Sequence, residues 1–210
     1  MSQMDPAMLL PIGPTASPAP PARGWVVLDR DGVINRDRGD YVKTPQELDF
    51  LPGSLAAIAR LTEAGFGVVV ATNQSAVGRG LLTREGLAVI HACLESEIQQ
   101  AGGRLAGIFV CPHAPDAHCR CRKPRPGLLQ RIAAWARIDP ATITVVGDAA
   151  RDLEAARSIG ARAVLVRTGH GERTLQERGP LIDFPVFKDL GEFAASWVAA
   201  ASDQASGRLP

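Results

Sequence analysis

Short, continuous apolar runs that alternate with helical patterns constrain the fold of this chain more than any other feature. The runs occupy residues 25–29, 67–73, 107–111, 142–148 and 162–166. Strands that are buried on both faces of a sheet read as such runs, whereas half-exposed strands alternate apolar and polar residues. Strands separated by helices are typical of a parallel sheet that is covered on both faces. The sequence therefore predicts an α/β fold with a mainly parallel sheet.

Three helices can be placed between these strands from their apolar stripes and end signals. The first has apolar residues at positions 55, 58 and 61 and ends near Gly65, where a left-handed residue can stop a helix. The second follows Thr83, a typical N-cap residue, and has apolar residues at positions 87, 90, 94 and 98. Pro126 suits the first turn of a third helix over about 127–137.

The remaining residues divide the chain into one domain and two flanking segments. Residues 1–24 are rich in Pro and Ala and lack periodicity, so they cannot bury enough apolar area to offset the entropy of ordering them. We expect a disordered leader over 1–24, one domain over 25–200 and a flexible tail over 201–210. A chain of 210 residues, 46% of them hydrophobic, can bury the core of one such domain.

Charge and composition exclude several classes of protein. The formal net charge of +1 argues against a broad nucleic-acid surface, and no apolar run approaches the roughly 18 residues of a membrane span. The N-terminus lacks a basic region followed by a long apolar region, so it does not predict a secretory signal. We expect a cytoplasmic monomer without nucleic-acid or membrane partners. In that compartment clustered cysteines bind metal more often than they form disulfides.

Polar side chains gather at the carboxyl ends of the predicted strands. They are Asp29, Thr72, Cys111 and Asp148. Open parallel sheets bind their ligands in the crevice at those strand ends, so we expect these side chains to share one edge of the sheet. Several groups delivered by different strands indicate a reactive site more strongly than one acid does, because chemistry needs the groups in one place.

The motif at residues 29–33, DRDGV, holds two acids that can take different roles. Side chains two residues apart on a strand point to the same side, and Gly32 would let the chain turn sharply after them. Two carboxylates this close repel each other unless a cation or a proton separates them. One can then act as nucleophile and metal ligand, and the other as proton donor. The alternative, a simple turn, is less consistent with the apolar strand before the motif.

A hard cation would suit the same edge of the sheet. The carboxylates of Asp29 and Asp148 and the carbonyl of Asp31 are oxygen ligands of the kind that Mg²⁺ prefers. Asp152 lies four residues after Asp148, in the first turn of a helix. It is either an acid favoured there by the helix dipole or a residue that supports the metal ligands, and the sequence leaves both open.

Two further positions suit a phosphoryl group. Thr72 offers a hydroxyl at a strand end, and the backbone N–H groups of residues 73–75 follow it. Lys123 offers a compact cation. The chain has no Walker-type phosphate loop, and we expect the glycine-rich string at 169–173 to be a turn.

The stretch CPHAPDAHCRCRKP, residues 111–124, holds three of the four cysteines of the chain. Its metal-ligand spacing is C-x-H-x5-C-x-C, and three thiolates with one imidazole suit a closed, structural Zn²⁺ site. The expected ligands are Cys111, His113, Cys119 and Cys121. His118 directly precedes Cys119 and is left out. A metal that cross-links this loop would fix the direction in which Lys123 points.

Taken together, these motifs resemble the haloacid dehalogenase-like phosphatases. The matching residues are Asp29-x-Asp31-Gly32, Thr72, Lys123 and Gly147-Asp148-x-x-x-Asp152. The resemblance covers nearly all of residues 25–168. It implies a Rossmann-like three-layer sandwich without a large cap domain, Mg²⁺ in the active site and an aspartyl-phosphate intermediate.

The resemblance also implies a role for each matching residue. Asp29 would be the nucleophile, and Asp31 would be the general acid and later the base. Thr72 and Lys123 would hold the phosphoryl group during transfer. The residues expected to touch the substrate are Asp37, Arg38, Gly39, Asp40, Asn73, Gln74, Ser75 and Arg122. The expected Mg²⁺ ligands are Asp29, Asp31 and Asp148.

The substrate is the least constrained part of this interpretation. The strings NQSAVGRG (73–80) and VRTGHG (166–171), with the cysteine loop, are similar to members that remove the 7-phosphate of D-glycero-D-manno-heptose 1,7-bisphosphate for lipopolysaccharide cores. Arg122, with Arg79 as a second candidate, could hold the phosphate that does not react. Members that hydrolyse histidinol phosphate carry a similar zinc loop and are the alternative. The basic string RCRKPRPG (120–127) suggests a third reading, a non-catalytic binding module.

Overall fold

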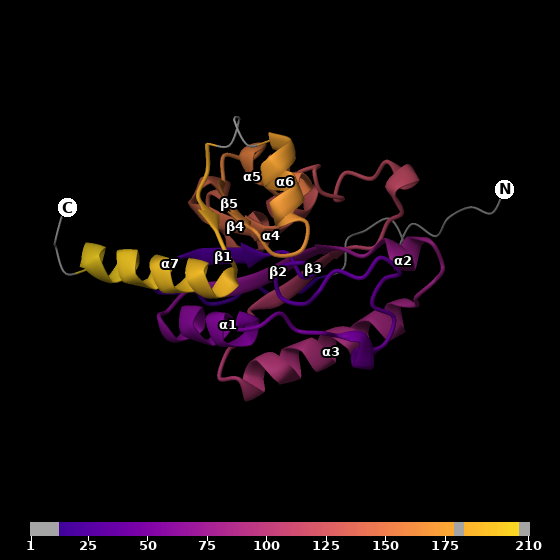
Figure 1. Ribbon diagram of the computed structural model, residues 1–210, viewed down its shortest axis with the longest axis horizontal. Helices are drawn as coiled ribbons and strands as arrows, with labels where there is room; N and C mark the ends of the chain where they lie inside the picture. The colour runs from indigo at the N-terminus through magenta and orange to yellow at the C-terminus, as the bar shows by residue number, and fades with distance from the viewer. Residues whose placement is uncertain (1–12, 179–182, 206–210) are drawn as a thin grey trace.

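A six-stranded sheet forms the middle layer of the molecule, and helices cover both of its faces (Figure 1). The computed structural model describes residues 13–178 and 183–205. The strand order is β3-β2-β1-β4-β5-β6, and all neighbouring strands are parallel. The predicted α/β three-layer sandwich is confirmed.

Five of the strands coincide with the apolar runs of the sequence. They are β1 (Trp25–Leu28), β2 (Gly67–Asn73), β3 (Gly107–Cys111), β4 (Ile143–Gly147) and β5 (Arg162–Val166). The sixth strand, β6 (Val186–Phe187), is an edge strand of two residues, too short to leave a run in the sequence.

The helices include the three that the sequence predicts. The α-helices are α1 (Ser54–Glu63), α2 (Ser75–Gly78), α3 (Arg84–Gln100), α4 (Gly127–Ala136), α5 (Ala150–Arg157), α6 (Gly171–Arg178) and α7 (Leu190–Ala205). Short 3₁₀ helices are η2 (Pro45–Glu47), η3 (Pro115–Ala117) and η4 (Pro140–Thr142). Thr83 caps α3, since its side chain accepts a hydrogen bond from the Gly86 N–H at 3.0 Å. Gly65, at a φ of +91°, follows the end of α1 as expected.

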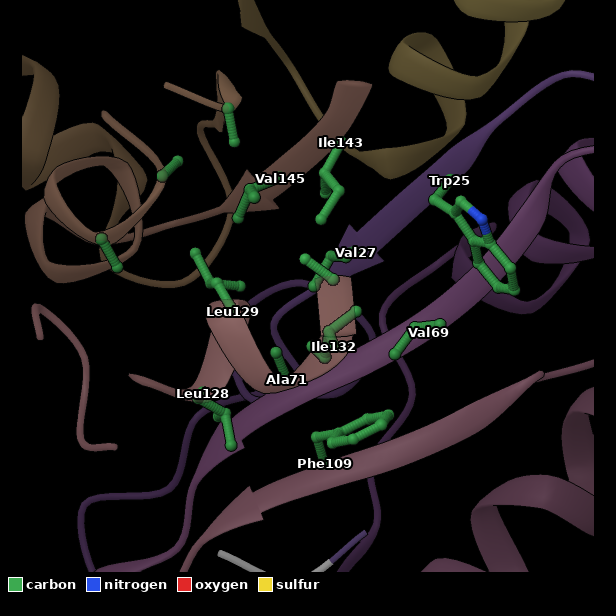
Figure 2. Packing of buried hydrophobic residues seen from close by; sticks show 14 of the residues in the cluster. Trp25, Val27, Val69, Ala71, Phe109, Leu128, Leu129, Ile132, Ile143 and Val145 are labelled. Atoms are coloured by element: carbon green, nitrogen blue, oxygen red, sulfur yellow. The ribbon is translucent and has the colours of Figure 1, made fainter. Parts of the chain in front are cut away.

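The two faces of the sheet build two separate cores. Alternate residues of β1 serve them: Trp25 and Val27 point to the face covered by α4 and α5, whereas Val26 and Leu28 point to the face covered by α1, α3 and α7. Figure 2 shows the first core, in which Leu128, Leu129 and Ile132 of α4 pack onto the sheet. This double burial explains why the strands are continuously apolar.

The flanking segments differ from the sequence expectation in two places. Helix α7 runs to Ala205, into the tail expected over 201–210, because its apolar residues continue onto the sheet as far as Ala201. Residues 13–24 form no helix or strand, yet they pack against the domain. The Ala16 carbonyl accepts a hydrogen bond from the Trp135 indole N–H, and the ring of Phe109 lies against Gly13. Residues 1–12 and 206–210 lie outside the described part of the chain.

The described residues contain no cap domain above the sheet. Between β1 and α1 the chain forms loops and η2, and between β3 and α4 it forms the cysteine loop with η3. No helix in residues 13–178 and 183–205 is long and apolar enough to cross a membrane. Strands β1 and β4 are neighbours in the sheet, but the chain leads from β1 to β2 toward one edge of the sheet and from β4 to β5 toward the other edge. Ligands bind at such a switch point in open parallel sheets.

Candidate active site and cysteine loop

A polar cavity of about 240 Å³ lies at the carboxyl end of the sheet. The predicted site residues that line it are Asp29, Asp31, Asp37, Arg38, Gly39, Thr72, Asn73, Gln74, Ser75 and Arg122. Arg30, Tyr41, Val42 and Arg151 also line it and were not predicted. The lining residues come from the segment after β1, from the end of β2 and the start of α2, from the cysteine loop and from α5. Lys123 and Asp148 do not line the cavity, but each is buried and pairs with a residue that does, Asp29 and Arg151 respectively.

Lys123 is a buried cation held between two carboxylates. Its Nζ atom lies 3.0 Å from Oδ1 of Asp29 and 2.6 Å from Oδ1 of Asp152, and it donates to the Ala71 carbonyl at 2.7 Å. Burial opposes its charge, but the two carboxylates outweigh this effect and raise the pKa of Lys123 above its usual value. Lys123 is therefore a fixed positive charge beside Asp29.

Asp152 takes a role that the sequence left open. Its Oδ1 atom pairs with Lys123, and its Oδ2 atom accepts a hydrogen bond from the Ala149 N–H at 3.2 Å, at the start of α5. Asp152 is thus an acid at a helix N-terminus, and it also orients Lys123. Gly147 makes this approach possible, because a Cβ atom there would overlap the Asp152 side chain.

Asp29 is buried, and one of its oxygens is occupied. Oδ1 accepts the Arg30 backbone N–H at 2.7 Å and pairs with Lys123. Oδ2 lies 3.8 Å from the guanidinium of Arg151, which lines the cavity. Burial raises the pKa of Asp29 to about 6, although Lys123 works in the opposite direction. A nearby cation would restore the carboxylate form.

The acids at the switch point fit a divalent cation. Asp29, Asp148 and Asp152 are buried, and one oxygen from each lies within 4.8 Å of the others. Oδ2 of Asp148 accepts the His170 N–H at 2.8 Å, while its buried Oδ1 has no hydrogen-bond partner among the described residues. Burial and the charges of Asp29 and Asp152 raise the pKa of Asp148 to about 8. Because Asp152 is committed to Lys123, Asp29 and Asp148 are the carboxylates available to Mg²⁺.

Gly32 and Gly169 give Asp148 its space. Both have positive φ angles, +84° and +56°, and a Cβ atom at either position would overlap the Asp148 carboxylate. The expected turn at 169–173 is correct only for its first residues, because α6 begins at Gly171. The N–H of His170 and the hydroxyl of Thr174 both donate to Asp148.

Asp31 is surrounded by hydrogen-bond donors. Its carboxylate accepts from the Arg30 guanidinium at 2.8 to 3.1 Å, from Asn35 at 2.9 Å and from Gln74 at 2.9 Å. Burial raises the pKa of Asp31, but these donors, led by Arg30, outweigh it and lower the pKa below its usual value. Of these donors, sequence reasoning found only Gln74, as a substrate contact.

The end of β2 braces two other site residues. Gln74 donates to Oγ1 of Thr72 at 2.8 Å as well as to Asp31, so the Thr72 hydroxyl hydrogen is left to donate elsewhere. Asn73 exchanges two hydrogen bonds of 3.1 Å with the backbone of Lys123. Asn73 and Gln74 line the cavity as predicted, and both also hold catalytic candidates in place.

The predicted substrate loop at 37–40 is only partly at the cavity. Asp37, Arg38 and Gly39 line it, whereas Asp40 does not and instead pairs with Lys43 at 2.8 Å and Arg38 at 3.2 Å on the surface. Asp37 contacts Nε2 of His170 at 2.8 Å, which links this loop to the one beside Asp148. No periodic pattern in the sequence could reveal this link, because it joins residues 133 positions apart.

The rim of the cavity is basic. Arg38, Arg122 and Arg151 all line it, and Arg122 donates weakly to the His113 carbonyl at 3.4 Å. Arg79, the second candidate for a phosphate contact, is not among the lining residues. Of these three arginines, Arg151 is the one that sequence reasoning missed. Its position between Asp148 and Asp152, on the first turn of α5, was the available signal.

The cysteine loop brings its four expected ligands together. The three sulfur atoms lie 3.3 to 3.6 Å apart, and Nδ1 of His113 lies 3.4 Å from Cys111 and 3.2 Å from Cys121. A tetrahedral site with Zn–S bonds of about 2.3 Å places its sulfur atoms about 3.7 Å apart. The hydrogen bond between the two thiols lowers the pKa of Cys111 to about 5 and raises the pKa of Cys121, so without a metal the pair keeps a proton. These residues fit Zn²⁺. His118 is exposed and is not part of the cluster.

Both arms of this loop are attached to the domain at glycines. The Gly78 N–H donates to the Pro112 carbonyl at 2.8 Å, and the Gly127 N–H donates to the Arg120 carbonyl at 3.1 Å. A Cβ atom at either glycine would overlap the loop backbone. Lys123 follows the last cysteine by two residues, and its backbone exchanges hydrogen bonds with Asn73 of β2.

Comparisons with known proteins agree with this geometry. A family model described as HAD-hydrolase-like matches residues 120–193. The chain is 47% identical over 169 residues to the D-glycero-β-D-manno-heptose-1,7-bisphosphate 7-phosphatase of Pseudomonas putida. This match covers 80% of this chain and 96% of that protein. It is 42% identical over 141 residues to the corresponding α-anomer phosphatase of Mycobacterium bovis, covering 65% of this chain and 73% of that protein.

A solved structure supports the same relationship. The crystal structure of the D,D-heptose 1,7-bisphosphate phosphatase of Bordetella bronchiseptica, complexed with magnesium and phosphate, superimposes with a TM-score of 0.82. The two chains are 45% identical, and the match covers 84% of this chain and 99% of the other. This chain therefore belongs to the haloacid dehalogenase-like phosphatases, within the family of the heptose 1,7-bisphosphate 7-phosphatases.

Proposed function

We propose that this protein is a Mg²⁺-dependent phosphatase that removes the 7-phosphate of D-glycero-D-manno-heptose 1,7-bisphosphate. One observation carries the proposal: a buried Asp29–Lys123 pair and an acid site for Mg²⁺ lie below a cavity with three arginines on its rim. The acids and Lys123 suit the phosphate that reacts. The arginines suit the phosphate that stays on the sugar.

In the first half-reaction, Asp29 acts as nucleophile. Its carboxylate oxygen bonds to phosphorus while the bond between phosphorus and the C7 oxygen breaks, which leaves an aspartyl phosphate. Lys123 and the Thr72 hydroxyl bind the phosphoryl oxygens. When bound by Asp29, Asp148 and the Asp31 carbonyl, Mg²⁺ supplies positive charge that offsets the negative charge on those oxygens.

Asp31 moves the proton. Its donors favour the carboxylate form in the substrate-free chain, so the proton enters with the monoanionic form of the reacting phosphate, whose second pKa is about 6. Asp31 passes it to the departing C7 oxygen. In the second half-reaction Asp31 takes a proton from water as that water attacks phosphorus. The bond to Asp29 then breaks, which releases phosphate.

Zn²⁺ in the cysteine loop is the second cofactor that we propose. The cluster is closed and offers four protein ligands, so it suits a structural metal and not a catalytic one. Its role is to hold the loop that delivers Lys123 and Arg122. Phosphoryl transfer depends mainly on positioning and charge, so loss of this order should reduce turnover.

The unreacted phosphate selects the substrate. Arg122 and Arg151 line the cavity on the side of the cysteine loop and α5, and Arg38 lines it from the loop after β1. An amino alcohol such as histidinol would place a cation near these arginines, which is unfavourable. The relatives with the higher identity and fuller coverage are named for the β-anomer, so we propose the β-anomer as substrate. A non-catalytic binding module would not require the acid site.

We further propose that the monomer acts in the cytoplasm, on the route to the nucleotide-activated heptose of lipopolysaccharide cores. The deciding experiment measures kcat/KM of one preparation for both anomers of the bisphosphate and for histidinol phosphate, because specificity is the ratio of these values. The β-anomer should give the highest value. A preference for histidinol phosphate would reject the substrate and leave the phosphatase chemistry standing.

A further inference from the structure

The Arg30 side chain joins the active site to helix α3. Its guanidinium contacts both oxygens of Asp31, with Nε at 3.1 Å and Nη2 at 2.8 Å from Oδ1 and Nη2 at 3.0 Å from Oδ2. The side chain is only 1% exposed. A planar guanidinium in such a fork fixes both the distance and the orientation of the carboxylate that it binds.

The far side of Arg30 is met by His91. Nη1 of Arg30 lies 3.4 Å from Nε2 of His91, a residue of α3 that is 61 positions away in the sequence. Burial, and next the positive charge of Arg30, lower the pKa of His91 to about 3. The imidazole is therefore neutral, so its Nε2 lone pair can accept the Arg30 hydrogen.

Helix α3 gives His91 a fixed position. The neighbouring residues Leu87, Ile90 and Leu94 are fully or almost fully buried, and Leu94 belongs to the core that joins α3 to the sheet. A chain of contacts thus runs from His91 on α3 through Arg30 to Asp31, the proposed proton-transfer residue. None of the mechanistic steps above uses His91.

We propose that His91 is a positioning residue that acts through Arg30 to hold Asp31 in line with the departing oxygen of the substrate. The proposal rests on the proposed function of Asp31 as the residue that protonates this oxygen. A proton donor must lie within hydrogen-bond reach of its acceptor, and small displacements reduce the rate strongly. Arg30 without its His91 contact can turn or shift, and the Asp31 carboxylate would follow.

This proposal makes a prediction that simple packing does not make. A sugar alkoxide is a poor leaving group and needs a proton, whereas para-nitrophenolate is stable without one. Because Asp31 also activates water in the second half-reaction, which both substrates share, only the first half-reaction depends on the leaving group. A displaced Asp31 should therefore slow formation of the aspartyl phosphate from sugar phosphates and leave its formation from para-nitrophenyl phosphate almost unchanged. A general loss of fold or of metal binding would slow both reactions alike.

The test compares His91→Leu with His91→Gln on the full-length, Mg²⁺-loaded protein. Leu keeps the bulk but removes the acceptor, and the Gln side-chain oxygen can replace Nε2. We expect His91→Leu to lower the single-turnover rate of aspartyl-phosphate formation from the heptose bisphosphate about tenfold, a fraction of the full effect of an acid catalyst. The burst rate of para-nitrophenolate release should change less than about twofold. His91→Gln should recover most of the loss.

Two controls keep the outcome decisive. Thermal unfolding curves identify a variant that fails to fold. In that case Arg30→Lys should show the same dependence on the leaving group, because Lys keeps the positive charge but cannot make the planar, multi-point contact of the guanidinium with the Asp31 carboxylate. Equal losses in the rate of intermediate formation from the two substrates, or no loss for His91→Leu, would overturn the positioning role. If the wild-type chain prefers another sugar phosphate, the substrate proposal fails while the same comparison with that sugar phosphate still tests His91. No phosphate release from any substrate would reject both.

Discussion

Two clusters in this molecule could each hold a metal ion, and they are assembled in opposite ways. The four ligands of the cysteine loop come from eleven consecutive residues, 111–121. The acids of the active site come from the ends of β1 and β4, 119 residues apart between Asp29 and Asp148, and are brought together by the sheet. The first cluster depends on local spacing and the second on strand register. Lys123 connects them, since it follows the loop and ends between Asp29 and Asp152.

The largest effect is expected from a substitution in the acid cluster that removes the nucleophile without unfolding the protein. Asp29→Asn keeps the size of the side chain but removes the nucleophile, so we expect phosphate release to fall by roughly 10⁴-fold or more. Circular dichroism and bound zinc should stay unchanged. Asp49→Asn is a matched control, because the Asp49 carboxylate is exposed and pairs with Arg36 on the surface. Near-normal turnover in Asp29→Asn would rule out the covalent mechanism.

Asp31→Asn tests whether the two acids of the motif have different tasks. We expect kcat on the bisphosphate to fall by roughly 10²- to 10⁴-fold, the typical contribution of a general acid or base. The aryl ester para-nitrophenyl phosphate distinguishes this variant from Asp29→Asn: formation of the aspartyl phosphate should survive without Asp31, and burst kinetics should detect it. A variant that forms no intermediate would place Asp31 in the first bond-forming step.

The cysteine loop can be broken without touching the acids. Cys119→Ser should lower bound zinc, measured by elemental analysis, from about one ion per chain. Loss of a support that orients a catalytic group should lower kcat by about 10- to 100-fold, with the Mg²⁺ requirement unchanged. Cys93→Ser is the control, because Cys93 lies on α3 outside the cluster. A zinc-free variant with full activity would show that the two clusters are independent.

The smallest effect concerns the arginines on the rim. Arg122→Ala should lower kcat/KM for the bisphosphate by about tenfold, as expected for the loss of one charge-assisted hydrogen bond to phosphate. A sugar monophosphate should lose less. Arg120→Ala, an exposed neighbour that does not line the cavity, serves as the control. Equal losses on both substrates would remove Arg122 from recognition of the second phosphate.

Much of the site could be predicted because its signals are local. Asp29, Thr72 and Asp148 lie at the ends of apolar strands, and the cysteine spacing lies within one loop. The supporting residues gave no such signal. Arg30 and His91 meet across 61 positions, and Asp37 and His170 across 133. Asp40 lies within the predicted substrate loop but points its carboxylate to Lys43 and Arg38 on the surface.

The sequence by itself determined five of the strands, three of the helices and the spacing of the four candidate ligands in the cysteine loop. Periodicity and spacing report which residues of a segment are buried together, and these features need no distant partner. Only the tertiary structure decided that Asp152 pairs with Lys123, that Arg151 faces Asp29, and that α7 and residues 13–24 pack on the domain. These contacts join segments far apart in the chain, and the register and packing of the sheet set their distances.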